Sequence, residues 1–382
     1  MPLKNLTHTA CGLLLAFTTI GVCACSPKPE GPEATPAAAH IDGSTPPSPP
    51  SRAQAVVERE IDPLVSQLKD TDATATAVLL NSSKRAEIAP RALPLLRKLK
   101  TLAAELKRSD DEQSQAYGNG VHSEVLPLLV VYGDSDTEKE LKTAAGGSGK
   151  SAAIAKSMLI TAQWLTSNQD VGVQQKLLAQ AADLGRTNPD SEAITDQLVT
   201  MMKIGPATPQ LRDEASSAIA AMNTPIGQML RERSQSIAKL REKLEGKPLT
   251  IVAVRNDGRP FTTADWAGKV ILVDFWATWC GPCKAALPRV KETYAKYHAK
   301  GLEIVGVSCD QEPDELTKFL AANPDMPWPQ LFDPQKPGLH ALAEQFGISS
   351  IPTMFLIDRK GIVRSVNAEE NFEELVPKLL AE

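Results

Sequence analysis

The spacing of apolar positions changes once in the body of the chain, near residue 247. Over residues 52–245, apolar side chains recur three or four positions apart, as in "AIAKSMLITAQWLTS" and "SEAITDQLVTMMKIG". This spacing predicts amphipathic helices, about eight of them, in an antiparallel or repeat-like array. Turn signals such as "TNPDS" and "GPATP" separate the helices. We therefore expect an all-helical domain over residues 52–245, and its sequence indicates no particular chemistry.

Residues 247–382 instead carry short apolar runs. The runs "KVILVDFWA" and "LEIVGVS" predict strands buried on both faces, and "LTIVAV" with the Asn-Asp-Gly turn after it predicts a hairpin. The segments "PDELTKFLAAN" and "FEELVPKLLA" predict helices, while "PTMFLID" and "IVRSV" flank the turn "DRKG" of a terminal hairpin. The order β-β-β-α-β-α-β-β-α, with a short helix near "GLHALAEQF", predicts an α/β domain: a mixed sheet flanked by helices.

Residues 1–25 have the pattern of an export signal. One early Lys precedes an uncharged apolar run over residues 10–24, which is short for a membrane-spanning helix and suits a secretory signal. The sequence "VCAC" resembles the bacterial lipobox, which implies a lipid on Cys25; ordinary cleavage after Ala24 also fits. Residues 26–51 are rich in Pro, Ala and Ser, which predicts an extended tether. We expect a periplasmic or otherwise extracytoplasmic protein, held at the membrane by a lipid anchor.

Charge and cysteine content narrow the function classes. The formal net charge of −5 gives no basic field, so nucleic acid is not an expected partner. Three of the six cysteines belong to the signal region, and the body contains only Cys280, Cys283 and Cys309. In an oxidising compartment the C-x-x-C pair predicts redox chemistry. Half a zinc site has the same spacing, but no second pair and no suitable His follow, so we expect neither metal nor cofactor.

The dithiol lies where a buried strand ends and a helix begins. The free N–H groups of a helix N-terminus stabilise a thiolate and lower its pKa, which makes Cys280 the candidate nucleophile. Cys283 is one helical turn further on and can resolve a mixed disulfide, while Gly281 and Pro282 keep the turn tight. Asp274 interrupts an apolar strand, so we expect a buried carboxyl with a raised pKa that takes the proton of Cys283. The alternative is that Asp274 only satisfies local backbone donors.

Two separated segments resemble the thioredoxin superfamily. "DFWATWCGPCKAALP" matches its active-site segment almost position for position, and "SSIPTMFLID" resembles its second signature. The resemblance implies that Pro352 is cis and faces the dithiol, and that the backbone of Ile351 pairs with a strand of the client. It also implies that Trp279, Gly281 and Pro282 contact the client.

Within that superfamily, the hairpin before the dithiol and the long insert after "GVSC" look like the TlpA/ResA branch of membrane-tethered thiol-disulfide oxidoreductases. This resemblance implies reduction of disulfides in extracytoplasmic client proteins, as in cytochrome c biogenesis. It further implies re-reduction by a membrane dithiol electron carrier of the DsbD/CcdA-like kind. Two positions depart from relatives: Asp274 stands where many of the branch carry Asn, and Gly306 replaces the buried Lys of thioredoxin. Without that cation we expect a still higher pKa for Asp274.

Two other functions remain open from the sequence. The helical domain could be the functional part of a binding or scaffold lipoprotein, with the dithiol an accessory. A peroxiredoxin-like peroxidase shares much of the fold, but it needs Thr where Ala277 stands. Cys309 ends a strand at the same edge of the sheet as the dithiol and is either a third redox thiol or a thiol without a role.

Overall fold

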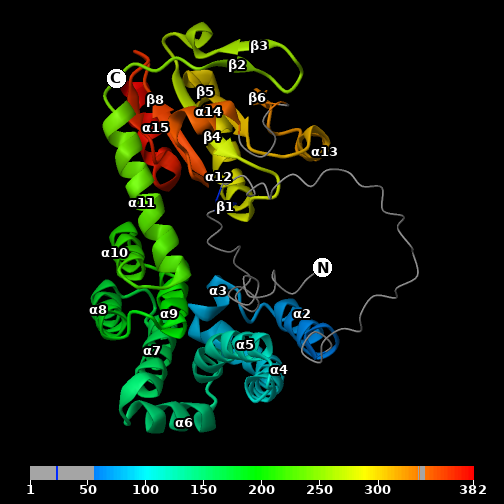
Figure 1. Cartoon of the computed structure of the whole chain (residues 1–382), viewed down its shortest axis with the longest axis vertical. Coiled ribbons are helices and arrows are strands. Elements are labelled where there is room, and N and C mark those ends of the chain that lie inside the picture. The colour runs from blue at the N-terminus through cyan, green and yellow to red at the C-terminus, as the bar shows by residue number, and fades with distance from the viewer. Residues whose placement is uncertain (1–22, 25–55, 334, 336–339) are drawn as a thin grey trace, which may run out of the picture. The chain divides into compact units, whose positions relative to one another are not determined.

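The computed structural model describes residues 23–24, 56–333, 335 and 340–382 (Figure 1). The lipidation predicted for Cys25, the tether of residues 26–51 and all but two residues of the export signal lie outside the described residues. The body of the chain divides into two units, and the division falls between Arg231 and Glu232, inside helix α11 (Pro225–Leu244).

The first unit is helical throughout its described part from residue 57 to residue 231. Here the chain forms ten α-helices up to and including α11, against about eight predicted, because α3 is a single short turn and α2 directly continues a π-helical turn. The elements before α11 are η3 (Val57–Ile61), α2 (Asp62–Asp70), α3 (Thr76–Leu79), α4 (Ser82–Lys107), α5 (Glu112–Val131), α6 (Ser135–Ala145), α7 (Gly149–Thr166), α8 (Val171–Thr187), α9 (Glu192–Lys203) and α10 (Pro209–Ala220).

Short polar side chains start most of these helices. A carboxylate, amide or hydroxyl oxygen at the N-cap accepts a hydrogen bond from a backbone N–H of the first turn, which would otherwise lack a partner. The capping residues are Asn81, Asp111, Asp134, Asp170, Ser191 and Thr208. At the centre of the unit, the fully buried Trp164 donates from Nε1 to the carbonyl of Ile204 at 2.7 Å.

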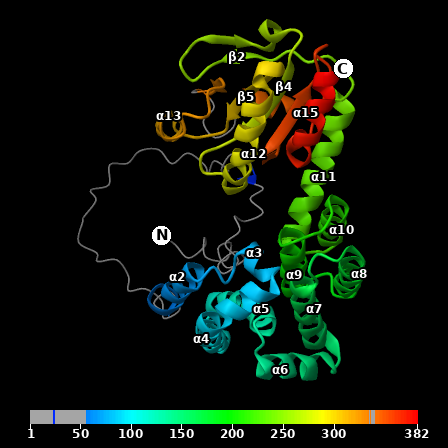
Figure 2. The ribbon, with the colours of Figure 1, turned by 180° about the vertical axis from the view of Figure 1, so that it is seen from behind.

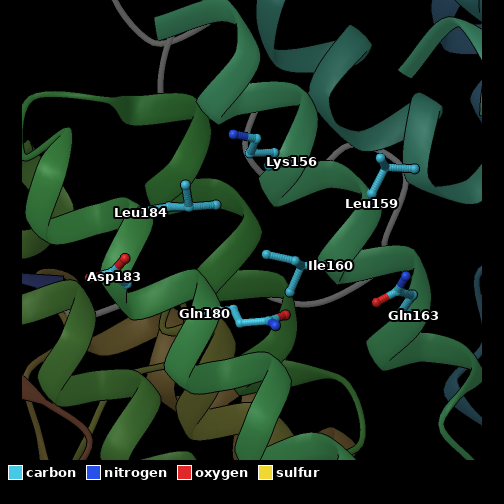
Figure 3. A pocket seen from close by; sticks show the side chains of 7 residues that line it. All are labelled: Lys156, Leu159, Ile160, Gln163, Gln180, Asp183 and Leu184. Carbon is cyan, nitrogen blue, oxygen red and sulfur yellow. The ribbon is translucent and has the colours of Figure 1, made fainter. Parts of the chain in front are cut away.

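Helices α7 and α8 border a pocket of about 480 Å³ on the first unit. Figure 3 shows its lining side chains, which come from two successive turns of α7 and from the second half of α8: Lys156, Leu159, Ile160, Gln163, Gln180, Asp183 and Leu184. The lining mixes apolar groups with one basic and one acidic side chain, and it contains no nucleophile.

The second unit is built on a five-stranded mixed sheet of order β6-β5-β4-β8-β9. The central strand β4 is parallel to β5 and antiparallel to β8, and a separate hairpin of β2 and β3 precedes it. The strands are β2 (Val252–Val254), β3 (Pro260–Thr262), β4 (Val270–Trp276), β5 (Leu302–Ser308), β6 (Gln330–Leu331), β7 (Ser350–Ile351), β8 (Thr353–Ile357) and β9 (Val363–Ser365). The longer helices are α12 (Gly281–Tyr297), α13 (Pro313–Ala322), α14 (Ala341–Phe346) and α15 (Phe372–Ala381).

Helices cover both faces of this sheet. All seven residues of β4 are buried, and successive side chains point to opposite faces. Phe275 packs against Phe346 of α14 on one face, while α12 and α15 contact each other on the other face (Figure 2). Asp274, next to Phe275 in the strand, therefore points to the face of α12. The mixed sheet flanked by helices confirms the predicted fold class; the two-residue strands β6 and β7 were not predicted.

The C-terminal half of α11 belongs to the second unit, which therefore begins at Glu232, earlier than the boundary at residue 247 expected from the sequence. The physical reason is packing: Leu240 and Leu244 are buried in the core under the sheet, and Ile237 packs against it. Among the described residues, no helix combines the length and apolar character needed to span a bilayer.

Candidate active site

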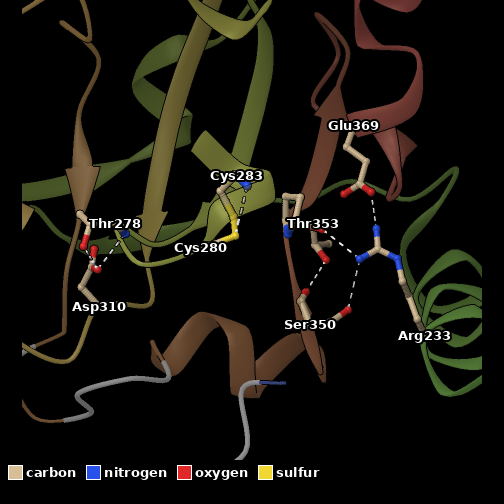
Figure 4. Close-up of a disulfide and its surroundings, with 9 residues drawn as sticks. Arg233, Thr278, Cys280, Cys283, Asp310, Ser350, Thr353 and Glu369 are labelled. Carbon is tan, nitrogen blue, oxygen red and sulfur yellow. Dashed lines mark hydrogen bonds and ion pairs between the residues drawn. A yellow bond between two sulfur atoms is a disulfide. The ribbon is translucent and has the colours of Figure 1, made fainter. Parts of the chain in front are cut away.

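Cys280 and Cys283 form a disulfide at the N-terminus of α12, with Cα atoms 5.3 Å apart (Figure 4). Cys280 occupies the N-cap, and its Sγ accepts a hydrogen bond from the backbone N–H of Cys283 at 3.2 Å. Pro282 lies in the first turn, where its missing N–H costs no hydrogen bond. The same N–H groups and the helix dipole would stabilise a thiolate on Cys280 after reduction.

The residues at and around the dithiol differ in their exposure to solvent. Both cysteines are buried, Gly281 and Pro282 are half-buried, and Trp279 is 40% exposed. An exposed indole directly before the reactive pair offers an apolar contact to an incoming polypeptide.

The strand segment next to the disulfide contains the cis peptide implied by the resemblance, Ile351–Pro352. Ile351 and Ser350 form β7, whose backbone pairs antiparallel with the two-residue strand β1 (Cys23–Ala24) of the same chain. Thr353 fixes the bend by donating its hydroxyl to the carbonyl of Ser350 at 2.7 Å. The backbone edge before Pro352 can thus accept an extended segment.

Asp274 lies at the centre of the sheet, opposite Gly306 of β5 and Met354 of β8. Its residue is 7% exposed, and its Oδ1 has no hydrogen-bond partner among the described residues. Burial, together with the negative charge of Glu369, raises the pKa of Asp274 to about 7. The unpartnered Oδ1 argues against the alternative in which Asp274 only satisfies local backbone donors.

Gly306 leaves room for a neutral side chain where thioredoxin has a buried Lys. The Oε1 of Gln330, from β6, lies where a side chain at position 306 would begin: a Cβ on Gly306 would lie 2.0 Å from this oxygen. The same oxygen accepts a hydrogen bond from Nε1 of Trp276 at 2.9 Å, which holds the Gln330 side chain in place. Among the described residues, the neutral amide of Gln330 thus occupies the space beside Gly306.

Glu369 and Arg233 are parts of the site that the sequence analysis missed. The Glu369 side chain, from the 3-10 turn η6 (Ala368–Glu370), is 17% exposed and pairs with the guanidinium of Arg233 from α11. Burial raises the pKa of Glu369 to about 7, although the Arg233 charge opposes this. Glu369 stands in the acidic run "AEENFEE", which indicates only a helix start, and Arg233 precedes the catalytic domain expected from the sequence. Nothing in the sequence pattern connects the two.

A second buried carboxylate, also missed, supports the loop that leads to Cys280. Asp310 is 1% exposed and accepts hydrogen bonds from the backbone N–H of Thr278 at 2.8 Å and from its hydroxyl at 2.6 Å. Ser308 donates a third at 2.8 Å. An Asp two residues after a buried strand, at the edge where the dithiol begins, was the available signal. Cys309, between them, is fully buried and takes no part in the disulfide.

The described residues contain no group of three His, Cys, Asp or Glu side chains placed to hold a metal ion. The chemistry that the site offers is that of its own thiols and carboxyls. A dithiol at a helix N-terminus, a cis proline beside it and a buried acid of raised pKa are together suited to thiol–disulfide exchange.

Comparison with known proteins agrees with this assignment. Residues 243–380 match the Redoxin family. The chain is 34% identical over 137 residues to the thiol-disulfide oxidoreductase ResA of Bacillus thuringiensis subsp. konkukian, covering 35% of this chain and 76% of the relative. The ResA of Geobacillus thermodenitrificans is 34% identical over 110 residues, or 29% and 60% of the two chains. A solved thiol:disulfide interchange protein of Chlorobium tepidum TLS is 26% identical over 36% of this chain and 99% of its own, with a TM-score of 0.31.

The fold and the dithiol thus define a thioredoxin-like thiol-disulfide oxidoreductase. The chain belongs, through its C-terminal domain, to the TlpA/ResA-like family of that superfamily. This confirms the family and the enzyme class expected from the sequence; the helical unit lies outside the matched residues.

Proposed function

We propose that the protein is an exported, membrane-tethered oxidoreductase that reduces disulfides of extracytoplasmic client proteins. The observation that carries the proposal is the Cys280–Cys283 disulfide at the start of α12, beside a strand edge that ends in a cis proline. Relatives named thiol-disulfide oxidoreductase and thiol:disulfide interchange protein support a protein client.

The reaction begins with the reduced dithiol. The Cys280 thiolate attacks one sulfur of the client disulfide, a Cys280–client disulfide forms, and the other client sulfur leaves as a thiolate. Cys283 then gives its proton to Asp274, and its thiolate attacks Sγ of Cys280. The second client sulfur leaves, and the protein ends in the disulfide form that the structure shows.

Asp274 suits the second step because its pKa of about 7 allows it both to accept and to release a proton near neutral pH. Ile351 and Pro352 would align the client backbone, and Trp279 would cover its apolar side chains. Each turnover oxidises the dithiol by two electrons. A membrane dithiol electron carrier of the DsbD/CcdA-like kind would restore them, and lipidation of Cys25 would keep the domain near that carrier.

The deciding experiment is the reduction potential of the Cys280–Cys283 couple in glutathione or dithiothreitol buffers. A value near that of thioredoxin, about −270 mV, is expected for a reductase. A value near about −120 mV would instead identify a disulfide donor and overturn the proposed direction.

The cellular role of the dithiol is separable from that of the helical unit. Replacement of Cys280 by Ser should abolish reduction of a disulfide-bonded peptide and reproduce the phenotype of a deletion. A Cys280→Ser strain that behaves as wild type would favour a scaffold function of the helical unit. Loss of acyl labelling in a Cys25→Ser variant would test the anchor.

A further inference from the structure

Arg233 contacts two parts of the active site at once, as Figure 4 shows. One guanidinium nitrogen, Nη2, pairs with the carboxylate of Glu369, and the other, Nη1, donates to the carbonyl of Pro352 at 3.4 Å and to the hydroxyl of Ser350 at 3.5 Å. The Arg233 side chain is only 13% exposed. The guanidinium is planar and rigid, so a movement of Glu369, Ser350 or Pro352 would break its bonds to the other two. Arg233 therefore restricts the positions of these three residues relative to one another.

The pairing strand for a client depends on this contact. Ser350 and Ile351 form the edge β7, and Pro352 is the cis residue that ends it. Arg233 is the side chain from outside this loop that bonds to both Ser350 and Pro352. Replacement of Arg233 would remove these bonds to the loop, which lie on the side away from the dithiol.

Glu369 connects the same arginine to the proposed proton acceptor. The charged groups that act on Glu369 are Arg233 from α11, Arg289 from α12 and Glu370 from its own turn, and Glu369 in turn acts on Asp274 of β4. Arg289 also donates to the Glu369 carbonyl at 3.4 Å. Oε2 of Glu369 has no hydrogen-bond partner among the described residues. Arg233 thus joins the Pro352 loop to a partly buried carboxyl group of η6.

We propose that Arg233 is a positioning residue of the disulfide exchange: through its bonds to Ser350, Pro352 and Glu369 it fixes the Pro352 loop for the client. This inference rests on the proposed role of Pro352 in client binding. Arg233 lies before residue 243, where the family match begins.

The competing explanation is that the Arg233–Glu369 ion pair only stabilises the fold. Arg364→Met is the control for the loss of an ion pair elsewhere in the domain. Arg364 pairs with the buried carboxylate of Asp358 at 3.0 Å, at the end of β8 opposite to Thr353. Its loss removes another ion pair of the same domain, with a more exposed arginine, without touching the dithiol surroundings.

The first test measures steady-state reduction of a disulfide-bonded peptide by the purified protein. Arg233→Met should raise KM about three- to tenfold, the effect of one or two lost hydrogen bonds, and should change kcat less than twofold. Arg233→Lys keeps the charge but not the fork, so it should give an intermediate KM and serves if the Met variant folds poorly. Arg364→Met should leave KM unchanged. Equal KM values for wild type and both Arg233 variants would overturn the role in client alignment.

The second test follows the carboxyl carbon of Glu369 by NMR during a pH titration of the oxidised protein. Arg233→Met removes the paired charge that opposes the raised pKa of Glu369, so the midpoint should move from near 7 to higher pH. The Arg364→Met midpoint should match wild type, and an unchanged midpoint in Arg233→Met contradicts the contact that holds the loop. This titration needs no turnover. A protein that lacked reductase activity altogether would therefore refute the proposed function while leaving this test valid.

Discussion

Two buried aspartates, one in each unit, have opposite electrostatics. Asp134 of the helical unit is 4% exposed and Asp274 of the catalytic unit is 7% exposed. Burial acts against ionisation of Asp134, but hydrogen bonds from Thr137 and Arg97 overcome it and lower the pKa of Asp134. Among the described residues no hydrogen-bond donor reaches Oδ1 of Asp274, and burial and the charge of Glu369 raise the pKa of this carboxyl to about 7. At similar surface exposure the two carboxyls thus differ in their donors and in their depth, so one is a helix cap and the other a candidate proton acceptor.

The largest expected difference is in catalysis. Asp274→Asn removes the proposed proton acceptor, and resolution of the mixed disulfide by Cys283 should slow by about 100-fold or more. Asp134→Asn should leave this rate within about twofold, since Asp134 lies outside residues 243–380, which match the Redoxin family and contain the dithiol. Single-turnover reduction of a disulfide-bonded peptide measures the rate. Equal rates in the two variants would contradict the role of Asp274 as the proton acceptor of Cys283.

Asp274→Asn should slow catalysis but should increase the free energy of unfolding at alkaline pH. A carboxyl whose pKa rises from 3.8 to about 7 on folding loses about 4 kcal/mol of stability between pH 4 and pH 8, because the native state binds its proton more tightly. Asp274→Asn should therefore be more stable than wild type at pH 8, by up to about 4 kcal/mol, and similar to it at pH 4. Urea unfolding at the two pH values measures this. A variant less stable than wild type at pH 8 would contradict the raised pKa.

The contribution of Asp134 to stability should depend on pH as expected for a charged helix cap. Asp134→Ala removes the hydrogen bond to the N–H of Thr137 at the start of α6 and should cost about 1–2 kcal/mol at pH 7. Asp134→Asn should cost less, since Asn caps helices as well as Asp. The lowered pKa means that this stabilisation is present above the unfolded pKa of Asp and is lost as pH falls through the folded pKa. A cost for the Ala variant that stays constant down to pH 2 would not fit a charged cap.

The smallest effect belongs to the partner of Asp134. Arg97 donates from Nε to Asp134 at 2.6 Å, but its side chain is 60% exposed. Solvent screens such a pair, so Arg97→Met should cost less than about 1 kcal/mol and should matter less at high salt. If Arg97→Met costs as much as Asp134→Ala, the arginine and not the capping bond determines the behaviour of Asp134.

Prediction from the sequence was most accurate for features that depend on residues close together in the chain. The run from Leu302 to Ser308 and the helix from Phe372 to Ala381 were predicted to the residue, because continuous burial and helical spacing are local signals. The dithiol and the isolated Asp274 could be recognised from such local signals, whereas the cis proline was implied by the resemblance to thioredoxin.

The remaining parts of the site depend on contacts between distant segments. Arg233 and Glu369 meet across 136 residues, and each alone resembles an ordinary surface charge of a helix or a helix start. Strand β6 has only two residues, too few for any periodicity, yet its Gln330 fills the space above Gly306. The absence of a basic residue at position 306 followed from the resemblance to thioredoxin, whereas the Gln330 side chain that fills this space could not be predicted.

The contact between Gly306 and Gln330 also restricts how this chain can change by mutation. A methyl group at position 306 would overlap Oε1 of a side chain that is 2% exposed and bonded to Trp276. A larger residue at 306 therefore displaces the amide end of Gln330, and Trp276 then needs a new acceptor for its N–H. A smaller residue at 330 would relieve the overlap, so substitutions at positions 306 and 330 should be coupled rather than additive.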